Sequence, residues 1–111
     1  MGITNWSNDI VVLDLSQEPE LIDELQCLSV ILREKSDCKV LIDFSEVGQM
    51  TATGISRLLE VRKLADHMAN RFALCNVPDA IRAMFNDAGH KRTIEVFDDR
   101  QFALISLDMV G

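Results

Sequence analysis

The sequence has few of the residues that form metal sites, disulfide frameworks and aromatic binding surfaces. Its 111 residues include two histidines, three cysteines, one tryptophan and no tyrosine. His67 and His90 each lack a partner at a spacing typical of metal ligands, so we expect no metal site. Cys27, Cys38 and Cys75 are an odd number without a CxxC pair, which is typical of a reducing compartment. We expect all three to be small core residues.

Positive charge and long apolar runs are also scarce. Eleven lysines and arginines stand against 18 acidic residues, for a net charge of −7. This balance argues against direct binding to nucleic acid or to anionic membranes, and it would favour a basic protein partner. The longest apolar runs, such as 10–13 and 40–42, are too short to span a bilayer, and no basic start leads into an apolar stretch. We therefore expect a cytoplasmic protein.

The chain lacks the motifs of nucleotide binding and of catalysis. Neither a P-loop nor a GxGxxG pattern occurs, so we expect no cofactor. No set of nucleophile, base and orienting group can be assembled around the histidines, so we expect no enzymatic activity. With 48% hydrophobic side chains, 111 residues can bury one core but not two. The prediction is a single domain over residues 1–111.

Apolar patterning predicts an antiparallel hairpin, a helix and a buried strand in the first part of the chain. The β-branched run 10–13 follows a turn sequence that joins it to a short strand at 3–6. Pro19 marks the start of a helix that ends near 36–37, with leucines at helical spacing: Leu21, Leu25, Leu28 and Leu32. The strand 39–44 is nearly continuous in apolar residues, which is expected of a central strand covered on both faces.

Helices and strands alternate through the rest of the sequence. A helix with one apolar face precedes a strand at 72–75, and a further helix runs from Pro78 to Gly89. A short strand at 94–97 leads to a last helix capped by Asp98-Asp99. The order predicts an α/β fold with one mixed, mostly parallel sheet of about four to five strands packed with about four helices. We expect these aromatic residues in the core: Trp6, Phe44, Phe72, Phe85 and Phe97.

The candidate functional segment runs from Lys39 to Ala65. In open α/β sheets, ligands and partners are usually met at the carboxyl ends of the strands. Here the buried strand leads through a polar loop into a helix that we expect to be capped by a threonine, Thr53. Its hydroxyl would then lie at a helix N-terminus on the rim of the sheet.

Three motifs resemble those of the STAS domain, the fold of bacterial anti-sigma factor antagonists. The sequence VLIDFSEV at 40–47 resembles the family's hydrophobic strand ending in Asp-x-Ser-x-Val. The sequence MTATGI at 50–55 resembles its Met-Asp-Ser-Ser-Gly-Leu segment, and 76–89 resembles its third-helix motif. The order and spacing of these motifs extend the resemblance to nearly the whole chain.

The resemblance implies a regulatory binding module whose partner is an anti-sigma factor serine/threonine kinase. In such antagonists the kinase uses ATP to phosphorylate the hydroxyl residue just before the glycine, which switches off binding. By position, that residue is Thr53. The implied docking surface runs from Ser45 to Arg57, and the candidate partner-binding residues are Asp43, Ser45, Met50, Thr51, Ala52, Thr53, Gly54 and Arg57. We expect Met50 to present adaptable apolar surface to the partner.

The chain departs from the family pattern at the acidic residue and the first serine of Asp-Ser-Ser-Gly, which are Thr51 and Ala52 here. The family's Gly-x-Leu-Asp segment is also not reproduced, and Glu18 or Glu20 is a candidate acidic substitute. These departures suggest that regulation has diverged.

Alternatives remain for each part of the site and for the function. Thr53 is either a phosphorylation switch or only a helix cap. Arg57 either contacts a phosphate or a partner, or is a solvated charge. Asp43 either takes part in partner recognition or only caps local N–H groups. The alternative function is a constitutive STAS scaffold, or a subunit of a stressosome-like or lipid-transport-like complex, without a phosphoryl switch. The sequence leaves the oligomeric state open.

Overall fold

One mixed sheet organises the protein. The computed structural model describes residues 2–7, 9–87 and 95–109. Over these residues the sheet has five strands in sequence order: β1 (Gly2–Asn5), β2 (Ile10–Asp14), β3 (Lys39–Asp43), β4 (Arg71–Cys75) and β5 (Glu95–Phe97). β1 pairs antiparallel with β2, and all the other pairs are parallel. The predicted hairpin, the mixed sheet and the central place of β3 are confirmed.

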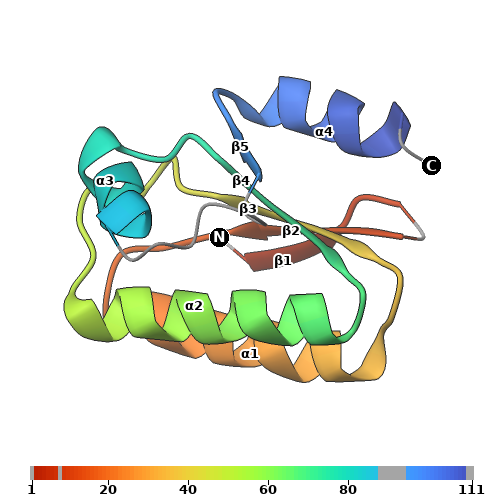
Figure 1. The fold of residues 1–111 in the computed structure, drawn as a ribbon, viewed down its shortest axis with the longest axis horizontal. Coiled ribbons are helices and arrows are strands. Elements are labelled where there is room, and N and C mark those ends of the chain that lie inside the picture. The colour runs from red at the N-terminus through yellow and green to blue at the C-terminus, as the bar shows by residue number, and fades with distance from the viewer. Residues whose placement is uncertain (1, 8, 88–94, 110–111) are drawn as a thin grey trace.

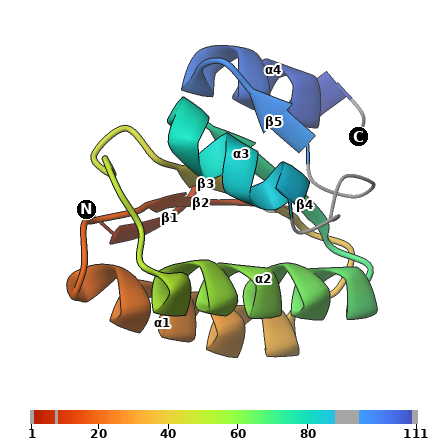
Figure 2. The ribbon, with the colours of Figure 1, turned by 60° about the vertical axis from the view of Figure 1, so that its left-hand side comes forward.

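The helices lie on both sides of the sheet. They are α1 (Glu20–Glu34), α2 (Ala52–His67), α3 (Asp79–Asp87) and α4 (Arg100–Met109). α1 and α2 lie side by side beneath one face, and α4 lies alone over the other (Figures 1 and 2). α3 lies near the end of the sheet where α2 begins (Figure 1).

Two apolar clusters fill the spaces between these layers. The larger joins the α1 and α2 faces to alternate residues of β2, β3 and β4, and it includes all four leucines predicted for α1. The smaller joins the opposite face of the same strands to Ala103, Leu104 and Leu107 of α4. Every residue of β3 is buried, because a strand with helices on both faces has no side open to water.

The strand register aligns the residues that form the site. Asp14, Asp43 and Cys75 are Cα partners across β2, β3 and β4. The parallel strands therefore end together at one edge of the sheet, and this carboxyl edge lies opposite the amino edge, where Lys39 pairs with Ile10 and Arg71.

Three expectations about individual side chains are corrected. Trp6 is exposed in the hairpin loop, and Cys27 is exposed on α1, whereas Cys38 and Cys75 are buried as expected. Met50 is buried in the larger cluster, so it does not present apolar surface to a partner. The predicted stop at 89 and the first residue of the strand predicted at 94–97 lie outside the described residues, as does the side chain of Phe85.

Candidate functional site

The loop after β3 reaches α2 at the carboxyl edge of the sheet. Its backbone turns through a hydrogen bond from Val47 N–H to the Phe44 carbonyl, at 2.9 Å. Phe44, Val47 and Met50 are all buried, so three apolar side chains hold the loop against the core. The residues between them, such as Ser45 and Gln49, are exposed. The loop is thus anchored while its polar side chains face water.

Thr51, and not Thr53, caps α2. Thr51 has an extended backbone, and its side-chain oxygen accepts a hydrogen bond from Gly54 N–H at 3.2 Å. Its carbonyl accepts the first helical hydrogen bond, from Ile55 N–H at 3.0 Å. The expectation that Thr53 is the cap is therefore wrong, because the helix begins two residues earlier than that expectation requires.

Thr53 lies in the first turn of α2 with its side chain exposed. Within the described residues its hydroxyl makes no hydrogen bond, so it is not committed to holding the fold. The residue lines an open polar hollow of about 480 Å³ on the helix surface, together with Ala52, Ser56, Arg57 and Glu60. The sequence prediction that Thr53 and Arg57 share one helix face is confirmed.

Arg57 is half-exposed beside Thr53. Its Nη1 lies 3.8 Å from the Glu60 Oε1, one turn along the helix. A solvated pair of this kind contributes little to stability and exchanges readily for another anion. The structure therefore leaves the Arg57 guanidinium available at the hollow.

Glu18, in the segment between β2 and α1, supplies a carboxylate to the start of α2. Its Oε2 accepts a hydrogen bond from Thr51 N–H at 2.7 Å, and its Oε1 accepts one from the Thr51 hydroxyl at 2.8 Å. The first turn of α2 has no acidic residue of its own. Glu18 thus places a negative charge where the helix dipole favours one. Of the two acidic substitutes suggested by the sequence, Glu18 is the one in contact with the loop.

Gly54 lies close to the ends of the Glu18 and Met50 side chains. A Cβ at this position would lie 2.9 Å from the Glu18 Oε2 and 3.3 Å from the Met50 Cε. A larger residue at 54 would require the ends of these side chains to shift, and a shift of the Glu18 carboxylate would weaken its hydrogen bonds to Thr51. Gly48, in the same loop, has no atom within 4 Å of such a Cβ.

Asp43 lies beneath the loop at the centre of a polar network. Its Oδ1 accepts hydrogen bonds from the backbone N–H and hydroxyl of Ser45 and from the Asn76 side chain at 3.1 Å. Its Oδ2 accepts from Arg100 at 3.3 Å, and the same Arg100 nitrogen also donates to Asp14. Asp43 therefore bonds the local Ser45 N–H, as one of the two roles left open by the sequence requires, and its part in partner recognition stays a prediction.

The pKa of Asp43 is lowered although the residue is buried. Burial is the largest single influence and would raise the pKa, but hydrogen bonds from Ser45, then from Asn76, together with the charge of Arg100, outweigh it. The neighbouring Cys75 thiol has the opposite shift, because burial and then the Asp43 charge raise its pKa to about 12. Cys75 is therefore an unreactive thiol.

A family model described as STAS domain matches residues 7–103. The chain belongs to the STAS domain family. No curated protein matches the chain significantly by sequence.

Solved structures of STAS proteins share the fold. An anti-sigma factor antagonist domain protein from Planctomyces limnophilus has a TM-score of 0.79 and 18% identity over 97% of this chain and 99% of that chain. An RsbS variant from Moorella thermoacetica has a TM-score of 0.82 and 18% identity over 97% of this chain and 94% of its own. The phosphorylated form of SpoIIAA from Bacillus has a TM-score of 0.76 and 16% identity over 98% and 97%. At these identities the likeness is one of fold.

Three site residues of this STAS domain were not singled out from the sequence. Asp14 had a usable signal, since it ends an apolar strand just as Asp43 does, and parallel strands end at the same edge. Asn76 has a positive φ of 55°, a conformation that asparagine tolerates. Its side-chain amide donates a hydrogen bond to Asp43. Arg100 had no local signal, because it reaches the network from the start of α4, 57 residues away from Asp43.

The described residues of this STAS domain were compared with the requirements of a metal site and of a membrane-spanning helix. In the part of the chain that the structure describes, no group of three or more His, Cys, Asp or Glu side chains is placed to hold a metal ion. None of the described helices is long and apolar enough to cross a membrane. The site presents the exposed hydroxyl of Thr53 and the guanidinium of Arg57. The loop that precedes them is held by apolar side chains buried in the core.

Proposed function

We propose that this chain is a single STAS domain, over residues 1–111, that acts as a regulatory binding module of the anti-sigma factor antagonist type. It docks through the exposed residues between Ser45 and Arg57 onto a serine/threonine kinase, and phosphorylation of Thr53 releases it. The observation that carries the proposal is the Thr53 hydroxyl, which is exposed beside an open polar hollow and makes no hydrogen bond within the described residues.

Membership of the family supports the general part of this proposal, which is a regulatory binding role. STAS domains are regulatory binding modules that are generally not enzymes. The solved structures that share the fold include the unphosphorylated and phosphorylated forms of the antagonist SpoIIAA and a component of the stressosome, described as a signal integration and transduction hub. A binding role in signalling is therefore the function that the fold favours.

Thr53 is a better phosphate acceptor than Thr51. The Thr51 hydroxyl donates to Glu18 and accepts from Gly54, so phosphorylating it would break the helix cap. The kinase would transfer the γ-phosphoryl group of ATP to the Thr53 oxygen, with release of ADP and of the hydroxyl proton to a base on the kinase. The kinase supplies ATP and the base, and this domain supplies the acceptor.

The added phosphate has partners near Thr53. The N-terminal end of a helix stabilises negative charge, and Arg57 lines the same hollow. Arg57 would exchange the weak pair with Glu60 for a stronger one with the phosphate. The phosphate would then change the charge of the docking surface without unfolding the domain, and Asp43, Met50 and Gly54 would support that surface from beneath.

The alternative is a constitutive scaffold, such as a subunit of a stressosome-like or lipid-transport-like complex, in which Thr53 is never modified. One observation favours it. Thr51 and Ala52 replace the acidic residue and the serine of the family motif, so the segment that carries Thr53 departs from that motif at two positions.

Phosphate mapping by mass spectrometry separates the two functions. Wild-type protein, Thr53→Ala and the control Ser56→Ala, a hydroxyl in the same hollow, are incubated with ATP and a lysate of the source organism. We expect phosphate on Thr53 in the wild type and in Ser56→Ala, and none on the 50–57 segment in Thr53→Ala. If the wild type carries no phosphate on 50–57 while the lysate kinases modify a control substrate, the scaffold function is the correct one.

A further inference from the structure

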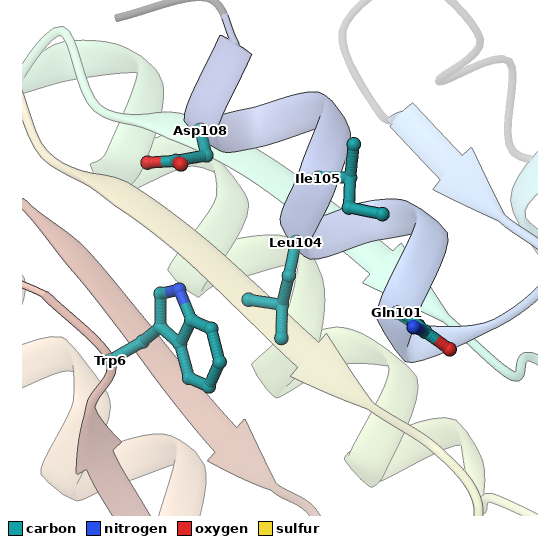
Figure 3. A pocket seen from close by; sticks show the side chains of 5 residues that line it. All are labelled: Trp6, Gln101, Leu104, Ile105 and Asp108. Atoms are coloured by element: carbon teal, nitrogen blue, oxygen red, sulfur yellow. The ribbon is translucent and has the colours of Figure 1, made fainter.

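A second surface lies on the other side of the sheet, between α4 and the β1–β2 hairpin. It carries two large apolar side chains that are open to water, with Trp6 54% and Ile105 51% exposed. A groove of about 250 Å³ separates the hairpin loop from the helix (Figure 3), and we call it the Trp6 groove. It is lined by Trp6, Gln101, Leu104, Ile105 and Asp108.

Both walls of the Trp6 groove are fixed by the fold. The four α4 residues lie at helical spacing i, i+3, i+4 and i+7, so they form one stripe along the helix. The adjacent stripe, with Ala103 and Leu107, is buried on the sheet, which prevents the helix from rotating. On the other wall, the backbone N–H of Trp6 donates to the Ile10 carbonyl at 2.9 Å. The backbone positions of both walls are therefore set by the fold.

The one charged side chain that lines the Trp6 groove is negative. Asp108 lies in the α4 wall, and none of the five residues that line the groove is basic. Lys39 lies at the same end of α4 but is 8% exposed, because its Nζ donates to the Leu107 carbonyl at 2.7 Å and pairs with Asp9 at 3.7 Å. The groove thus joins exposed apolar side chains to the exposed carboxylate of Asp108.

We propose that the Trp6 groove binds a basic amphipathic helix of a protein partner. A helix matches the i, i+3, i+4, i+7 stripe on α4, and its apolar face would cover Trp6 and Ile105. Lysine or arginine residues beside that face would pair with Asp108. A second copy of this chain is a poorer match, because each copy carries a net charge of −7 and would set Asp108 against acidic residues.

The Trp6 groove is separate from the Thr53 site. Lys39, which begins β3, lies at the groove end of the sheet, whereas Thr53 follows the opposite end of the same strand. Two partners can therefore be bound at once, one at each edge of the sheet. This inference stands whether or not Thr53 is phosphorylated.

Trp6 provides a direct readout, since it is the only tryptophan in a chain without tyrosine. The probe is an 18-residue amphipathic peptide of leucine and lysine, and the control peptide has glutamate in place of lysine. We expect a saturable blue shift of Trp6 emission with the lysine peptide alone, and weaker binding at higher salt. Ile105→Gln should weaken binding by about tenfold. Val30→Gln, which alters a comparably exposed residue of α1, should leave binding unchanged.

Three outcomes would overturn the proposal: no saturable shift with the lysine peptide, equal binding of the glutamate peptide, or equal effects of Ile105→Gln and Val30→Gln. A blue shift that grows with protein concentration in the absence of peptide, together with a doubled mass in light scattering, would assign the groove to a second copy instead. Circular dichroism of each variant checks that these exposed substitutions leave the fold intact.

Discussion

Glu18 shows how a single side chain can restore a charge that a motif has lost. The family's acidic residue at the start of α2 is Thr51 here, yet the carboxylate of Glu18 reaches the same turn from a different segment. The sequence suggested Glu18 or Glu20 without choosing between them. Only the packing of the β2–α1 segment against the start of α2 selects Glu18, because the contact spans 33 residues of sequence.

The close approach at Gly54 predicts energetic coupling to Glu18. Glu18→Ala should lower the free energy of unfolding by about 1–2 kcal/mol in the wild type, since it removes two hydrogen bonds to Thr51. In a Gly54→Ala background the carboxylate is already displaced, so the same change should cost much less. Urea unfolding of the two single variants and the double variant measures this coupling.

Gly48→Ala is the matched control, since a Cβ at Gly48 meets no atom within 4 Å. The cost of Glu18→Ala in that background should equal its cost in the wild type. Additive effects of Glu18→Ala and Gly54→Ala would show that the carboxylate does not depend on the glycine.

At the scale of elements, the start of α2 decides which threonine stabilises the fold and which is free to be modified. The sequence places two threonines in one turn, and either satisfies the pattern of a helix cap. Which of the two threonines caps the helix depends on which loop residue is the last one buried in the core. Because Met50 is buried, the next residue, Thr51, is held in the extended conformation that a cap requires.

The two threonines should therefore differ in stability. Thr51→Ala should lower the free energy of unfolding by about 1–2 kcal/mol, because the cap is lost. Thr53→Ala should change it by less than about 0.5 kcal/mol, since the side chain is exposed and makes no hydrogen bond within the described residues. Thermal or urea unfolding provides the comparison.

Thr51→Ser keeps the capping oxygen and should recover most of the stability lost in Thr51→Ala. A larger loss in Thr53→Ala than in Thr51→Ala would reverse the assignment of the cap.

At the scale of the whole molecule, the Asp43 network connects both faces of the sheet. Asp14 and Asp43 end neighbouring strands, Ser45 begins the loop toward α2, and Arg100 begins α4 on the other face. The loop that carries the candidate docking surface is thus tied to the helix that carries the Trp6 groove. A substitution that removes one of these interactions is therefore expected to lower the stability of the entire fold.

Asp43→Asn should therefore be destabilising in a pH-dependent way. The folded pKa of Asp43 lies below its ordinary value of 3.8, so its ionised form stabilises the fold above about pH 4, and this contribution is lost as pH falls through the lower folded pKa. At pH 7 the variant should lose about 1–3 kcal/mol of unfolding free energy. The difference from wild type should shrink below pH 4, as measured by urea unfolding across pH.

Asp37→Asn is the control for this pH series, because Asp37 is exposed. It should differ from wild type by less than about 0.5 kcal/mol at every pH. A constant difference between Asp43→Asn and wild type down to pH 2 would mean that the charge of Asp43 does not stabilise the fold.

The sequence by itself determined the elements, their order and the family. Its apolar periodicity set the helices and strands, and the buried run 39–43 could only be a central strand. Tertiary structure decided the rest. It chose Thr51 over Thr53 as the cap, brought Glu18 and Arg100 to the carboxyl edge, turned Met50 inward and left Trp6 exposed beside α4. Periodicity reflects which face of an element is buried, whereas these contacts depend on which distant segment packs against that element, and no local pattern encodes that.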